Sequence, residues 1–434
     1  MTRGGVRDTD VLVVGAGPAG IAAATRAADA GRTVVLLDES PAVGGQIWRH
    51  RVRDQLPAIA RMWMARVERS GARIWCGTAM VDLRDDGGVF ITTIERNGVP
   101  SVIHAGAVIL ATGARERFLP FPGWTLPGVI GVGAAQALLK GGTSFAGKRV
   151  VIAGSGPLLL PVAGALSSAG ADVRRVAEQA SRRTVARFGL GLLRRPATLL
   201  QAARYRASFI GSPYRFGEWV AAARGDAHVE EVDITNGAST QTIGCDVLCA
   251  AFGLIPNTEL ARLLGCAMTQ GAIVVDDQQQ TSRSHVYCAG EPTGIGGMEL
   301  ALVEGEIAGL SSAGRTAEAL ALSPRRARLR TMASAMELAF ALRPELRALA
   351  SVDTIVCRCE DVQLGAIDPA WSMRKAKLYT RAGMGPCQGR VCGAALEFLF
   401  DWPADAVRLP VVPALYSTLV AESAAAARPA DQGD

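Results

Sequence analysis

Four cysteines toward the end of the chain are spaced in a way that suits an iron–sulfur cluster. A Cys-x-Cys pair lies in Val356-Cys357-Arg358-Cys359-Glu360, and a Cys-x4-Cys pair follows in Cys387-Gln388-Gly389-Arg390-Val391-Cys392. Brought together, the pairs supply four thiolates, which is the ligand set of a [2Fe–2S] cluster. The alternatives are a structural zinc site, whose cysteines are usually separated by about two to four residues, and buried cysteines without metal. The pattern favours iron–sulfur and predicts the metal ligands Cys357, Cys359, Cys387 and Cys392.

A Gly-rich turn near the start of the chain has the context of a dinucleotide-binding fingerprint. The apolar strand Asp10–Val14 leads into Gly15-Ala16-Gly17-Pro18-Ala19-Gly20, an Ala-rich helix to about Ala30 and a second strand, Thr33–Leu37. The glycines allow the tight turn, the approach of the pyrophosphate and the packing of helix on strand, while the helix N-terminus stabilises phosphate charge. An acidic residue after the second strand binds ribose in this motif. The predicted contacts are Gly15, Gly17, Gly20, Asp38 and Glu39.

Three further segments indicate that this dinucleotide is FAD. Val43-Gly44-Gly45-Gln46 follows the second strand, where a flavin needs backbone close to its ring. Two later strands, Ala107–Ala111 and Val286–Ala289, end in Thr-Gly and Gly-Glu. These segments are similar to those of flavoproteins with two dinucleotide-binding domains, although glutathione-reductase-like members have Gly-Asp at the last position. The flavin contacts predicted here are Gly45, Gln46, Thr112, Gly113, Gly290 and Glu291.

A second strand–turn–helix–strand unit repeats this architecture in the middle of the chain. Lys148–Ala153 leads into Gly154-Ser155-Gly156-Pro157-Leu158-Leu159-Leu160-Pro161, and a helix precedes a strand that ends near Glu178. Leu159 stands where the fingerprint has its third glycine, so we expect altered packing of helix on strand. NAD(P) binding and a retained scaffold that binds nothing both stay open. If the unit binds a nucleotide, its contacts are Gly154, Gly156 and Glu178.

Composition limits the class of protein. With 434 residues, 49% of them hydrophobic, the chain should form two or three domains with substantial cores. The net charge of +6 comes almost entirely from arginine, and eight arginines without an acidic residue lie between Arg182 and Arg215. A nucleic-acid patch, an anion site and a docking face are open for this run. We favour contact with a partner chain over nucleic acid.

The sequence shows no sign of export or membrane insertion. Arg7-Asp8-Thr9-Asp10 is charged and leads directly into the first strand, so no signal sequence is expected. Val150–Ala171 is uncharged and long enough to cross a bilayer, but its glycines and prolines divide it into strand, turn and helix. The five other cysteines fit buried thiols in a reducing cytoplasm. No cysteine lies between Cys76 and Cys245, so a thiol–disulfide mechanism is not expected.

These patterns predict an α/β, glutathione-reductase-like flavoprotein with two dinucleotide-binding domains and a C-terminal cluster module. The FAD domain is expected to be discontinuous, because the second nucleotide-type domain is inserted into it. An Arg-rich helical linker could bind a partner, and the tail should wrap the surface and end disordered. The predicted boundaries are 1–118 and 246–315 for the FAD domain, 119–245 for the second Rossmann-type domain, 316–350 for the linker, 351–400 for the [2Fe–2S] module and 401–434 for the tail.

Over nearly its whole length, the chain resembles the flavoprotein α (A) subunits of hetero-oligomeric amine and imino-acid dehydrogenases. This group includes the α (A) subunits of opine oxidase and D-hydroxyproline dehydrogenase and one of the subunits of hydrogen cyanide synthase. The resemblance rests on the second Gly-rich turn, on Val356–Glu360 and on Thr380–Cys392. The cysteine-rich end is also similar to the bacterioferritin-associated-ferredoxin type of [2Fe–2S] module, which commonly closes with Cys-x2-Cys where this chain has Cys-x4-Cys.

The resemblance implies that this chain receives electrons from a partner subunit and passes them on. In the resembled group, amine oxidation occurs at the FAD of a separate β flavoprotein subunit, and the α subunit receives the electrons. Such complexes can also hold an FMN between subunits and a small γ subunit. Leu159 then becomes a family feature, in keeping with a second domain that need not use NAD(P)H. No catalytic residue is predicted in this chain, because the cofactors carry the chemistry.

Three functions follow from these patterns. The leading one is an electron-transfer subunit of a complex that acts on the C–N bond of a secondary amine or imino acid, with opine, hydroxyproline, proline, sarcosine and glycine all open. The alternative is a self-sufficient NAD(P)H-dependent FAD/[2Fe–2S] reductase. The third is a redox sensor or scaffold whose cluster is structural.

Overall fold

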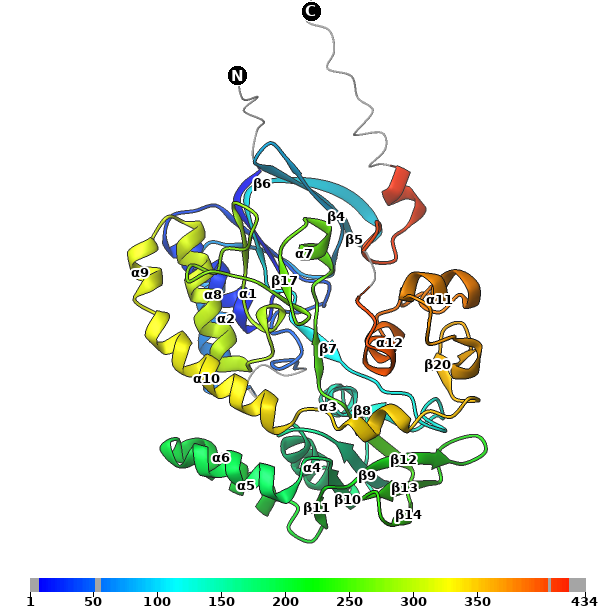
Figure 1. The fold of residues 1–434 in the computed structure, drawn as a ribbon. Coiled ribbons are helices and arrows are strands. Elements are labelled where there is room, and N and C mark those ends of the chain that lie inside the picture. Colours follow the sequence, from blue (N-terminus) through cyan, green and yellow to red (C-terminus); the bar gives the residue numbers. More distant parts are fainter. Residues whose placement is uncertain (1–7, 51–55, 405–406, 421–434) are drawn as a thin grey trace, which may run out of the picture. The chain divides into compact units, whose positions relative to one another are not determined.

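Two compact units make up the chain, which a computed structural model describes over residues 8–50, 56–404 and 407–420 (Figure 1). The first unit comprises the described residues of 1–114, 256–333 and 406–434, and the second comprises 115–255 and those of 334–405. The chain enters the second unit within β7 (Ala114–Glu116), leaves it within β16 (Leu254–Pro256) and enters it again within α10 (Ser323–Ala339). The first Gly-rich turn therefore lies in the first unit, while the second turn and the four cysteines lie in the second.

The first unit is built on a seven-stranded sheet in the order β3-β2-β1-β6-β5-β4, with β19 also paired to β6. The long strand β6 joins the parallel and the antiparallel part of this sheet. Its C-terminal half runs parallel to β1 and β19, and its N-terminal half pairs antiparallel with β5. The strands are β1 (Thr9–Val14), β2 (Val34–Leu37), β3 (Arg73–Trp75), β4 (Thr78–Asp86), β5 (Val89–Arg96), β6 (Val99–Leu110) and β19 (Val286–Cys288).

Both faces of the central strands are buried, which explains why β1 and β2 read as continuous apolar runs. One face packs against α1 (Pro18–Asp29), α2 (Ala58–Arg69) and α8 (Met298–Ser312), and α1 and α8 lie side by side in Figure 1. A Cβ on Gly305 would lie 2.1 Å from the carbonyl oxygen of Ala19, and one on Gly309 would lie 2.3 Å from that of Ala23. Small residues on both helices therefore allow this close contact.

The second unit has a parallel five-stranded sheet in the order β11-β10-β9-β15-β8. A separate three-stranded antiparallel sheet, β12-β13-β14, packs in the same unit. The main strands are β8 (Val129–Gly131), β9 (Arg149–Gly154), β10 (Asp172–Glu178), β11 (Tyr214–Phe216) and β15 (Val247–Ala251). The others are β12 (Trp219–Arg224), β13 (Glu231–Thr235) and β14 (Thr240–Gly244), and the helices are α3 (Val132–Lys140), α4 (Leu159–Ser168), α5 (Arg182–Gly191) and α6 (Pro196–Ala207). The α/β architecture of two dinucleotide-binding domains is thus confirmed.

The cysteine-rich segment forms a small body with its own apolar core inside the second unit. Its core joins Cys357 and Cys392 to apolar residues of the segment, such as Ala376 and Leu396. Its elements are β20 (Ile355–Cys357), β21 (Val362–Gln363), α11 (Met373–Thr380) and α12 (Cys392–Phe400). A local core of this kind can fix the positions of the Cys-x-Cys and Cys-x4-Cys segments.

The predicted linker is helical, with α9 (Thr316–Leu320), α10 and a 3₁₀ turn over Pro344–Ala348. The tail contacts the first unit: the Val411 N–H donates to the carbonyl oxygen of Val81 at 3.1 Å. The predicted disordered end falls on residues 421–434, and part of the segment Arg7–Asp10 also lies outside the described residues.

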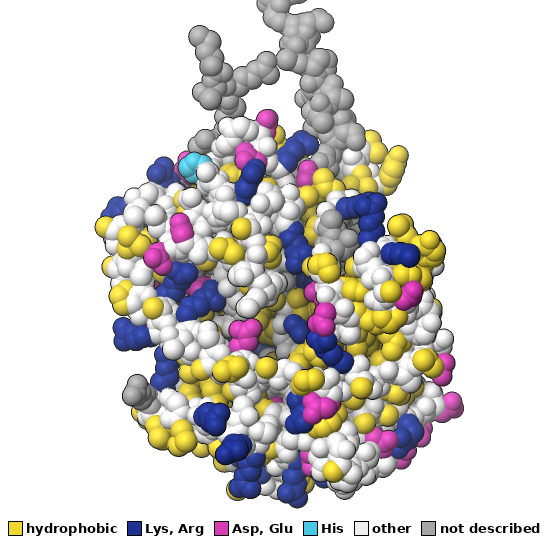
Figure 2. Space-filling model, in the orientation of Figure 1, with side chains coloured by type: hydrophobic (Ala, Val, Ile, Leu, Met, Phe, Trp, Pro, Cys, Tyr) yellow, Lys and Arg dark blue, Asp and Glu magenta, His cyan; other side chains and the backbone are white. Residues whose placement is uncertain are grey.

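The Arg-rich run forms α5 and α6, neither of which buries a described residue completely. Figure 2 shows basic and hydrophobic side chains interleaved over these helices. The uncharged segment Val150–Ala171 divides into β9, a turn and α4. No helix in the described part of the chain is both long and apolar enough to traverse a bilayer.

Candidate flavin site and cysteine cavity

The first Gly-rich turn is a tight connection between β1 and α1. Gly15 has φ +102°, and a Cβ there would lie 2.3 Å from the carbonyl oxygen of Ala111. A Cβ on Gly20 would lie 1.7 Å from the carbonyl oxygen of Gly15, so only glycine lets the helix approach the turn so closely. No neighbouring heavy atom lies within 4 Å of the Cβ position of Gly17. The turn therefore offers free backbone at the N-terminus of α1, which is where a pyrophosphate binds in this motif.

Asp38 lies directly beside this turn. Its carboxylate accepts the Ala16 N–H at 2.6 Å and the Ser40 N–H at 2.7 Å, one on each oxygen. A carboxylate oxygen can accept a second hydrogen bond, so these contacts fix the side chain and leave it able to bind a ribose hydroxyl. The neighbouring Glu39 is exposed, and of the two acids only Asp38 contacts the turn.

The predicted Gly-Gly segment also reaches the turn. The Gly44 N–H donates to the carbonyl oxygen of Ala16 at 2.8 Å. Gly45 has φ +56°, and a Cβ there would lie 3.0 Å from the Cα of Gly17. Gln46 follows as an exposed residue. Backbone from two distant parts of the sequence therefore meets at one point, as a dinucleotide site requires.

Thr112 and Gly113 extend from the end of β6 and are held by a residue that the sequence reading missed. The Thr112 hydroxyl donates to the carbonyl oxygen of Asn257 at 2.7 Å, and the Asn257 side-chain amide donates to the carbonyl oxygen of Thr112 at 2.9 Å. The Asn257 N–H donates to the carbonyl oxygen of Gly113 at 3.0 Å. Asn257 follows the proline that ends β16, and this Pro-Asn step is the signal that could have identified it.

The Gly-Glu segment after β19 closes a loop before α8. The Glu291 carboxylate accepts the Gly296 N–H at 2.8 Å and the Gly297 N–H at 2.9 Å. Burial raises the pKa of Glu291, although the two N–H donors oppose that effect. A Cβ on Gly290 would lie 2.9 Å from the Ala19 side chain of α1. The predicted residues after β1, β6 and β19 thus gather at the carboxyl ends of neighbouring parallel strands.

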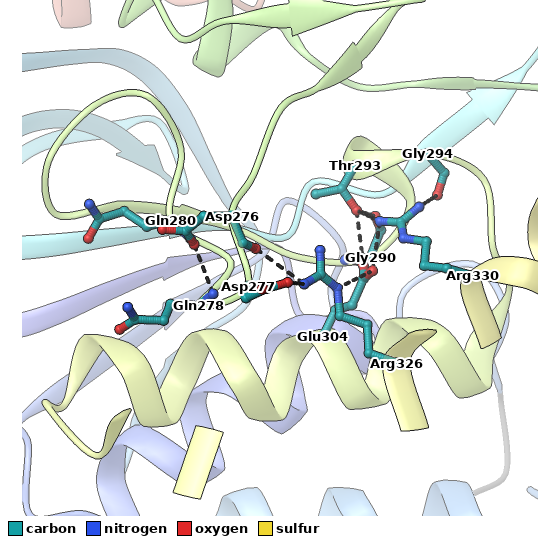
Figure 3. A network of polar contacts seen from close by, with 10 residues as sticks. All are labelled: Asp276, Asp277, Gln278, Gln280, Gly290, Thr293, Gly294, Glu304, Arg326 and Arg330. Atoms are coloured by element: carbon teal, nitrogen blue, oxygen red, sulfur yellow. Dashed lines mark hydrogen bonds and ion pairs between the residues drawn. The ribbon is translucent and has the colours of Figure 1, made fainter. Parts of the chain in front are cut away.

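A buried ionic network supports this last segment (Figure 3). Glu304 of α8 is fully buried and accepts the Gly290 N–H and the Thr293 hydroxyl, each at 3.0 Å. Its other carboxylate oxygen lies 2.6 Å from the Arg330 guanidinium and 3.7 Å from that of Arg326. The Arg-rich linker thus supplies two cations to a carboxylate beneath the flavin segment. The sequence indicated only that this linker could bind a partner, and it gave no signal for Glu304.

The second Gly-rich turn has the same tight entry but a different helix. Gly154 has φ +153°, and a Cβ there would lie 1.9 Å from the carbonyl oxygen of Ala251. Gly156 has φ +104° with free space around its Cβ position. Leu159 is completely buried in the core, and it is the first residue of α4. The helix therefore begins later than its counterpart α1, which starts directly after the second glycine of its turn.

Glu178 ends β10 and is completely buried. Its carboxylate accepts the N–H groups of Gly156 and Ala180, each at 2.9 Å. Burial raises the pKa of Glu178 to about 7, since hydrogen bonds offset only part of the desolvation.

A segment of the chain itself, residues 340–343, lies along the edge of the second turn. The Ser155 hydroxyl donates to the carbonyl oxygen of Phe340 at 2.7 Å. The Gln179 side chain donates to the carbonyl oxygen of Ala341 at 2.9 Å and accepts the Arg343 N–H at 3.0 Å. Both anchors, Ser155 and Gln179, are neighbours of the predicted nucleotide contacts. The carboxyl ends of β9 and β10 are therefore covered by protein.

The four predicted metal ligands line one cavity of about 120 Å³. The Cys392 thiol beside Cys357 lowers the pKa of Cys357 to about 5, and the Gly383 N–H acts in the same direction. The structure therefore brings together all four cysteines from segments that are far apart in the sequence.

Backbone and aromatic groups complete this cavity. The Gly383 N–H donates to the Cys357 sulfur at 3.4 Å. Phe118 and Trp124 line the cavity together with Arg358 and Val391. The Trp124 indole donates at 2.6 Å to the carbonyl oxygen of Ile355, just before the Cys-x-Cys pair. The sequence reading missed both aromatic residues, because they precede the cysteines by more than 200 residues.

In the described part of the chain, no group of three or more His, Cys, Asp or Glu side chains is arranged so that it could hold a metal ion. The four cysteines that line the cavity have the chemistry of a four-thiolate ligand set, which is the set that holds a [2Fe–2S] cluster.

The fold and the first turn define a flavoprotein with two dinucleotide-binding domains. The chain belongs to the pyridine nucleotide-disulphide oxidoreductase family, whose model matches residues 9–308. It is an FAD-dependent oxidoreductase.

Several relatives match most of the chain. One is the opine oxidase α (A) subunit of Rhizobium meliloti, 32% identical over 93% of this chain and 86% of that protein. Another is "Hydrogen cyanide synthase subunit HcnB" of Pseudomonas protegens, 32% identical over 88% of this chain and 89% of that protein. The crystal structure of L-proline dehydrogenase from P. horikoshii has the same fold. Its TM-score is 0.68, its identity 20%, and the match covers 95% of this chain and 79% of that one.

The family's name refers to a disulfide, but the buried cysteines of the second dinucleotide-binding domain are not reactive thiols. Cys245 and Cys249, near and within β15, are buried. Burial raises the pKa of Cys245 to about 12 and that of Cys249 further. Thiols of this kind are poor nucleophiles at neutral pH, because the thiolate is the reactive form.

Proposed function

We propose that this chain is the flavo-iron–sulfur subunit of a hetero-oligomeric oxidoreductase that acts on the C–N bond of a secondary amine or imino acid. It binds FAD in the first unit and a [2Fe–2S] cluster on the four cysteines. A partner β flavoprotein oxidises the amine, and this chain passes the electrons to an external acceptor. The observation that carries the proposal is the convergence of Cys357, Cys359, Cys387 and Cys392 on one cavity.

The relatives support the substrate class and the need for a partner. The opine oxidase and hydrogen cyanide synthase relatives are both named as subunits, and they match this chain over most of its length. Opines are secondary amines, and proline, the substrate in the name of the structural neighbour, is an imino acid. An FMN at the interface between subunits and a small γ subunit belong to the same proposal.

The residues of the first unit fit FAD. The turn from Gly15 to Gly20 would hold the pyrophosphate on the N-terminus of α1, and Asp38 would bind a ribose hydroxyl. Gly45, Thr112 and the Gly290 segment would place rigid backbone near the flavin ring. FAD would supply two-electron chemistry, and a [2Fe–2S] cluster passes one electron at a time. The protein would set the distance between the cofactors, their electrostatic environment and the access of other molecules to them.

The second candidate is a self-sufficient NAD(P)H-dependent reductase, which the second Rossmann-type turn favours. Three observations count against it. The buried Leu159 stands where the fingerprint has its third glycine, and residues 340–343 hydrogen-bond Ser155 and Gln179 along the edge where a dinucleotide would bind. Glu178, the proposed ribose contact, is completely buried. We therefore propose that the second unit is a scaffold that does not use NAD(P)H.

Anaerobic rapid mixing tests the source of the electrons. We expect NADH or NADPH to leave the flavin absorbance of the purified chain unchanged. The flavin should bleach only when the chain is co-purified with its β partner and supplied with octopine, proline, hydroxyproline, sarcosine or glycine. Rapid bleaching by micromolar NADH or NADPH without the partner would replace our proposal with the reductase.

A matched pair of variants tests the cluster. Cys392→Ala removes a thiol from the cavity, so it should abolish the iron–sulfur absorbance and the EPR signal of the reduced protein. Cys249→Ala removes a thiol that is equally buried but lies in β15, and it should keep both signals. A full signal in Cys392→Ala would show that these cysteines are not the ligands.

A further inference from the structure

Helices α5 and α6 and the residues that adjoin them present large apolar side chains to solvent. Leu190, Leu193 and Ile210 are 68%, 66% and 77% exposed, and Leu200 is also more than half exposed. A single exposed leucine is ordinary in a protein surface. Several large apolar side chains gathered on one pair of helices, with basic side chains among them (Figure 2), mark an interaction site instead.

The two helices are anchored mainly at their ends. Neither helix contains a completely buried described residue. Leu192, between the helices, and Phe209, after α6, are buried. The Arg206 guanidinium lies 4.9 Å from the centre of the Phe209 ring and donates to the carbonyl oxygen of Phe209 at 3.0 Å. These contacts hold the helices in place and leave their outward sides uncovered.

The same helices carry positive charge that the chain does not neutralise. Arg183, Arg187 and Arg204 are exposed, and in the described part of the chain they take part in no ion pair. No Asp, Glu or Lys lies between Arg182 and Gly217. Arginine is enriched and lysine depleted in protein interfaces, because the planar guanidinium is weakly hydrated and binds carboxylates through two hydrogen bonds. A chain that covers these helices must therefore supply carboxylates, and a second copy of the same face would place arginine against arginine.

The spacing of these residues separates a protein partner from a membrane or a nucleic acid. Arg183, Arg187 and Leu190 follow one another at intervals of four and three residues along α5, so they lie in one row. Leu200 and Arg204 repeat this arrangement on α6. A helix that lies on a membrane keeps its cations and its apolar residues on opposite sides. A mixed row fits a protein interface, which combines apolar contacts with charge pairs, and a phosphate backbone offers nothing to the leucines.

We propose that α5 and α6 form a docking face for a partner chain whose own surface combines carboxylates with apolar side chains. This rests on the proposed function, in which the partner is the β flavoprotein. Arg183 and Arg187 pair with its carboxylates, and Leu190 and Leu193 pack against its apolar side chains.

Charge reversal tests this face. The probe is the β flavoprotein that co-purifies with the wild-type chain, and biolayer interferometry measures its dissociation constant for each variant. Arg183→Glu combined with Arg187→Glu should weaken the complex at least about tenfold, because attractive charge pairs become repulsive. Arg32→Glu combined with Arg69→Glu is the control, since it changes the net charge equally at exposed arginines of the first unit that bind carbonyl oxygens. It should leave the affinity unchanged, and FAD content and thermal unfolding confirm that both double variants fold.

A second pair of substitutions tests the apolar part of the face. Leu190→Ser combined with Leu193→Ser keeps every charge and should also weaken the complex, by about tenfold. Wild-type affinity for the β flavoprotein in both the arginine and the leucine variants would overturn the proposal.

Phosphatidylglycerol vesicles and duplex DNA are the probes for the other two kinds of partner. Binding of either that is lost in the arginine variant, while the affinity for the β flavoprotein is kept, would overturn the protein partner. A wild-type chain that forms no complex with the β flavoprotein would refute the proposed function, and with it this face as a subunit contact.

Discussion

The two Gly-rich turns of this chain begin alike and diverge at their sixth residue. Gly20 lets α1 approach the first turn so closely that a Cβ would lie 1.7 Å from the carbonyl oxygen of Gly15. Leu159 occupies the matching position of the second turn, is buried in the core and begins α4. The first helix starts immediately after its second glycine, so its N-terminus stays next to the turn. The comparison teaches that the same Gly-x-Gly entry can be followed by two different helix starts.

A buried carboxylate in each unit marks the second difference. Glu304 of the first unit has two guanidinium partners, Arg326 and Arg330 (Figure 3). Glu178 of the second unit has only N–H and hydroxyl donors, and burial raises its pKa to about 7. The first carboxylate supports the segment that follows β19, while the second belongs to an edge covered by residues 340–343. The buried carboxylate of the first unit is therefore paired with cations, while that of the second is held by neutral donors.

The largest effect is expected when the first turn is given the residue of the second. Gly20→Leu forces a side chain into backbone, because the Cβ alone would overlap the carbonyl group of Gly15. We expect the purified variant to lose its bound FAD, measured as flavin absorbance per protein after dialysis. Gly189→Leu, at a helical glycine with no neighbour within 4 Å, is the control and should keep FAD. Full FAD occupancy in Gly20→Leu would remove the basis of the comparison.

Next in size is the loss of the buried carboxylate in the first unit. Glu304→Ala leaves Arg330 and Arg326 without their buried partner, so the free energy of unfolding should fall by about 3–5 kcal/mol. Urea denaturation measures this change. Glu318→Ala removes a surface pair with Arg315 and should cost less than about 1 kcal/mol. Equal losses in the two variants would mean that the Glu304 network does not stabilise the fold.

The carboxylate of the second unit should make stability depend on pH. The folded-state pKa of Glu178 is about 7, above the ordinary value of 4.5, so the folded state binds the proton more tightly than the unfolded state. Its contribution is therefore fully present below about pH 4.5 and is lost as the pH rises through 7, by at most about 3 kcal/mol.

Glu178→Gln keeps the shape of the side chain but cannot ionise. We expect the variant to have a flatter profile of unfolding free energy between pH 5 and 8 than the wild type. Thermal unfolding across this range measures the difference. If wild type and variant follow the same profile, Glu178 is not the titrating group.

The smallest effect concerns the ribose contact of the first unit. Asp38→Ala removes a hydrogen bond acceptor beside the turn, and we expect FAD to bind roughly tenfold more weakly, or about 1.4 kcal/mol. Glu39→Ala changes an exposed neighbour and should leave FAD affinity unchanged. Fluorescence titration of the apoprotein with FAD distinguishes the two. Equal affinities would show that Asp38 only ties β2 to the turn.

Local patterns in the sequence predicted the elements well, because strand, Gly-rich turn and helix follow one another along the chain. The same patterns identified the cysteines that meet in one cavity. Contacts between distant segments were not predictable in this way. In the sequence, Glu304 is an ordinary helical residue, and only the folded chain brings Arg330 into contact with it. Trp124 likewise hydrogen-bonds Ile355, which lies more than 200 residues away in the sequence. Residues 340–343 carry no motif, so nothing in the sequence showed that they cover the second turn.

Chemical analysis of the anaerobically purified protein tests the central claim most directly. If the first unit holds the flavin and the cysteine cavity holds the cluster, the protein should contain FAD in equal amount to the chain. Iron and acid-labile sulfide should be present in the ratio of a [2Fe–2S] centre. Protein that contains zinc in place of iron, or that has neither iron nor sulfide after anaerobic reconstitution, would contradict the account.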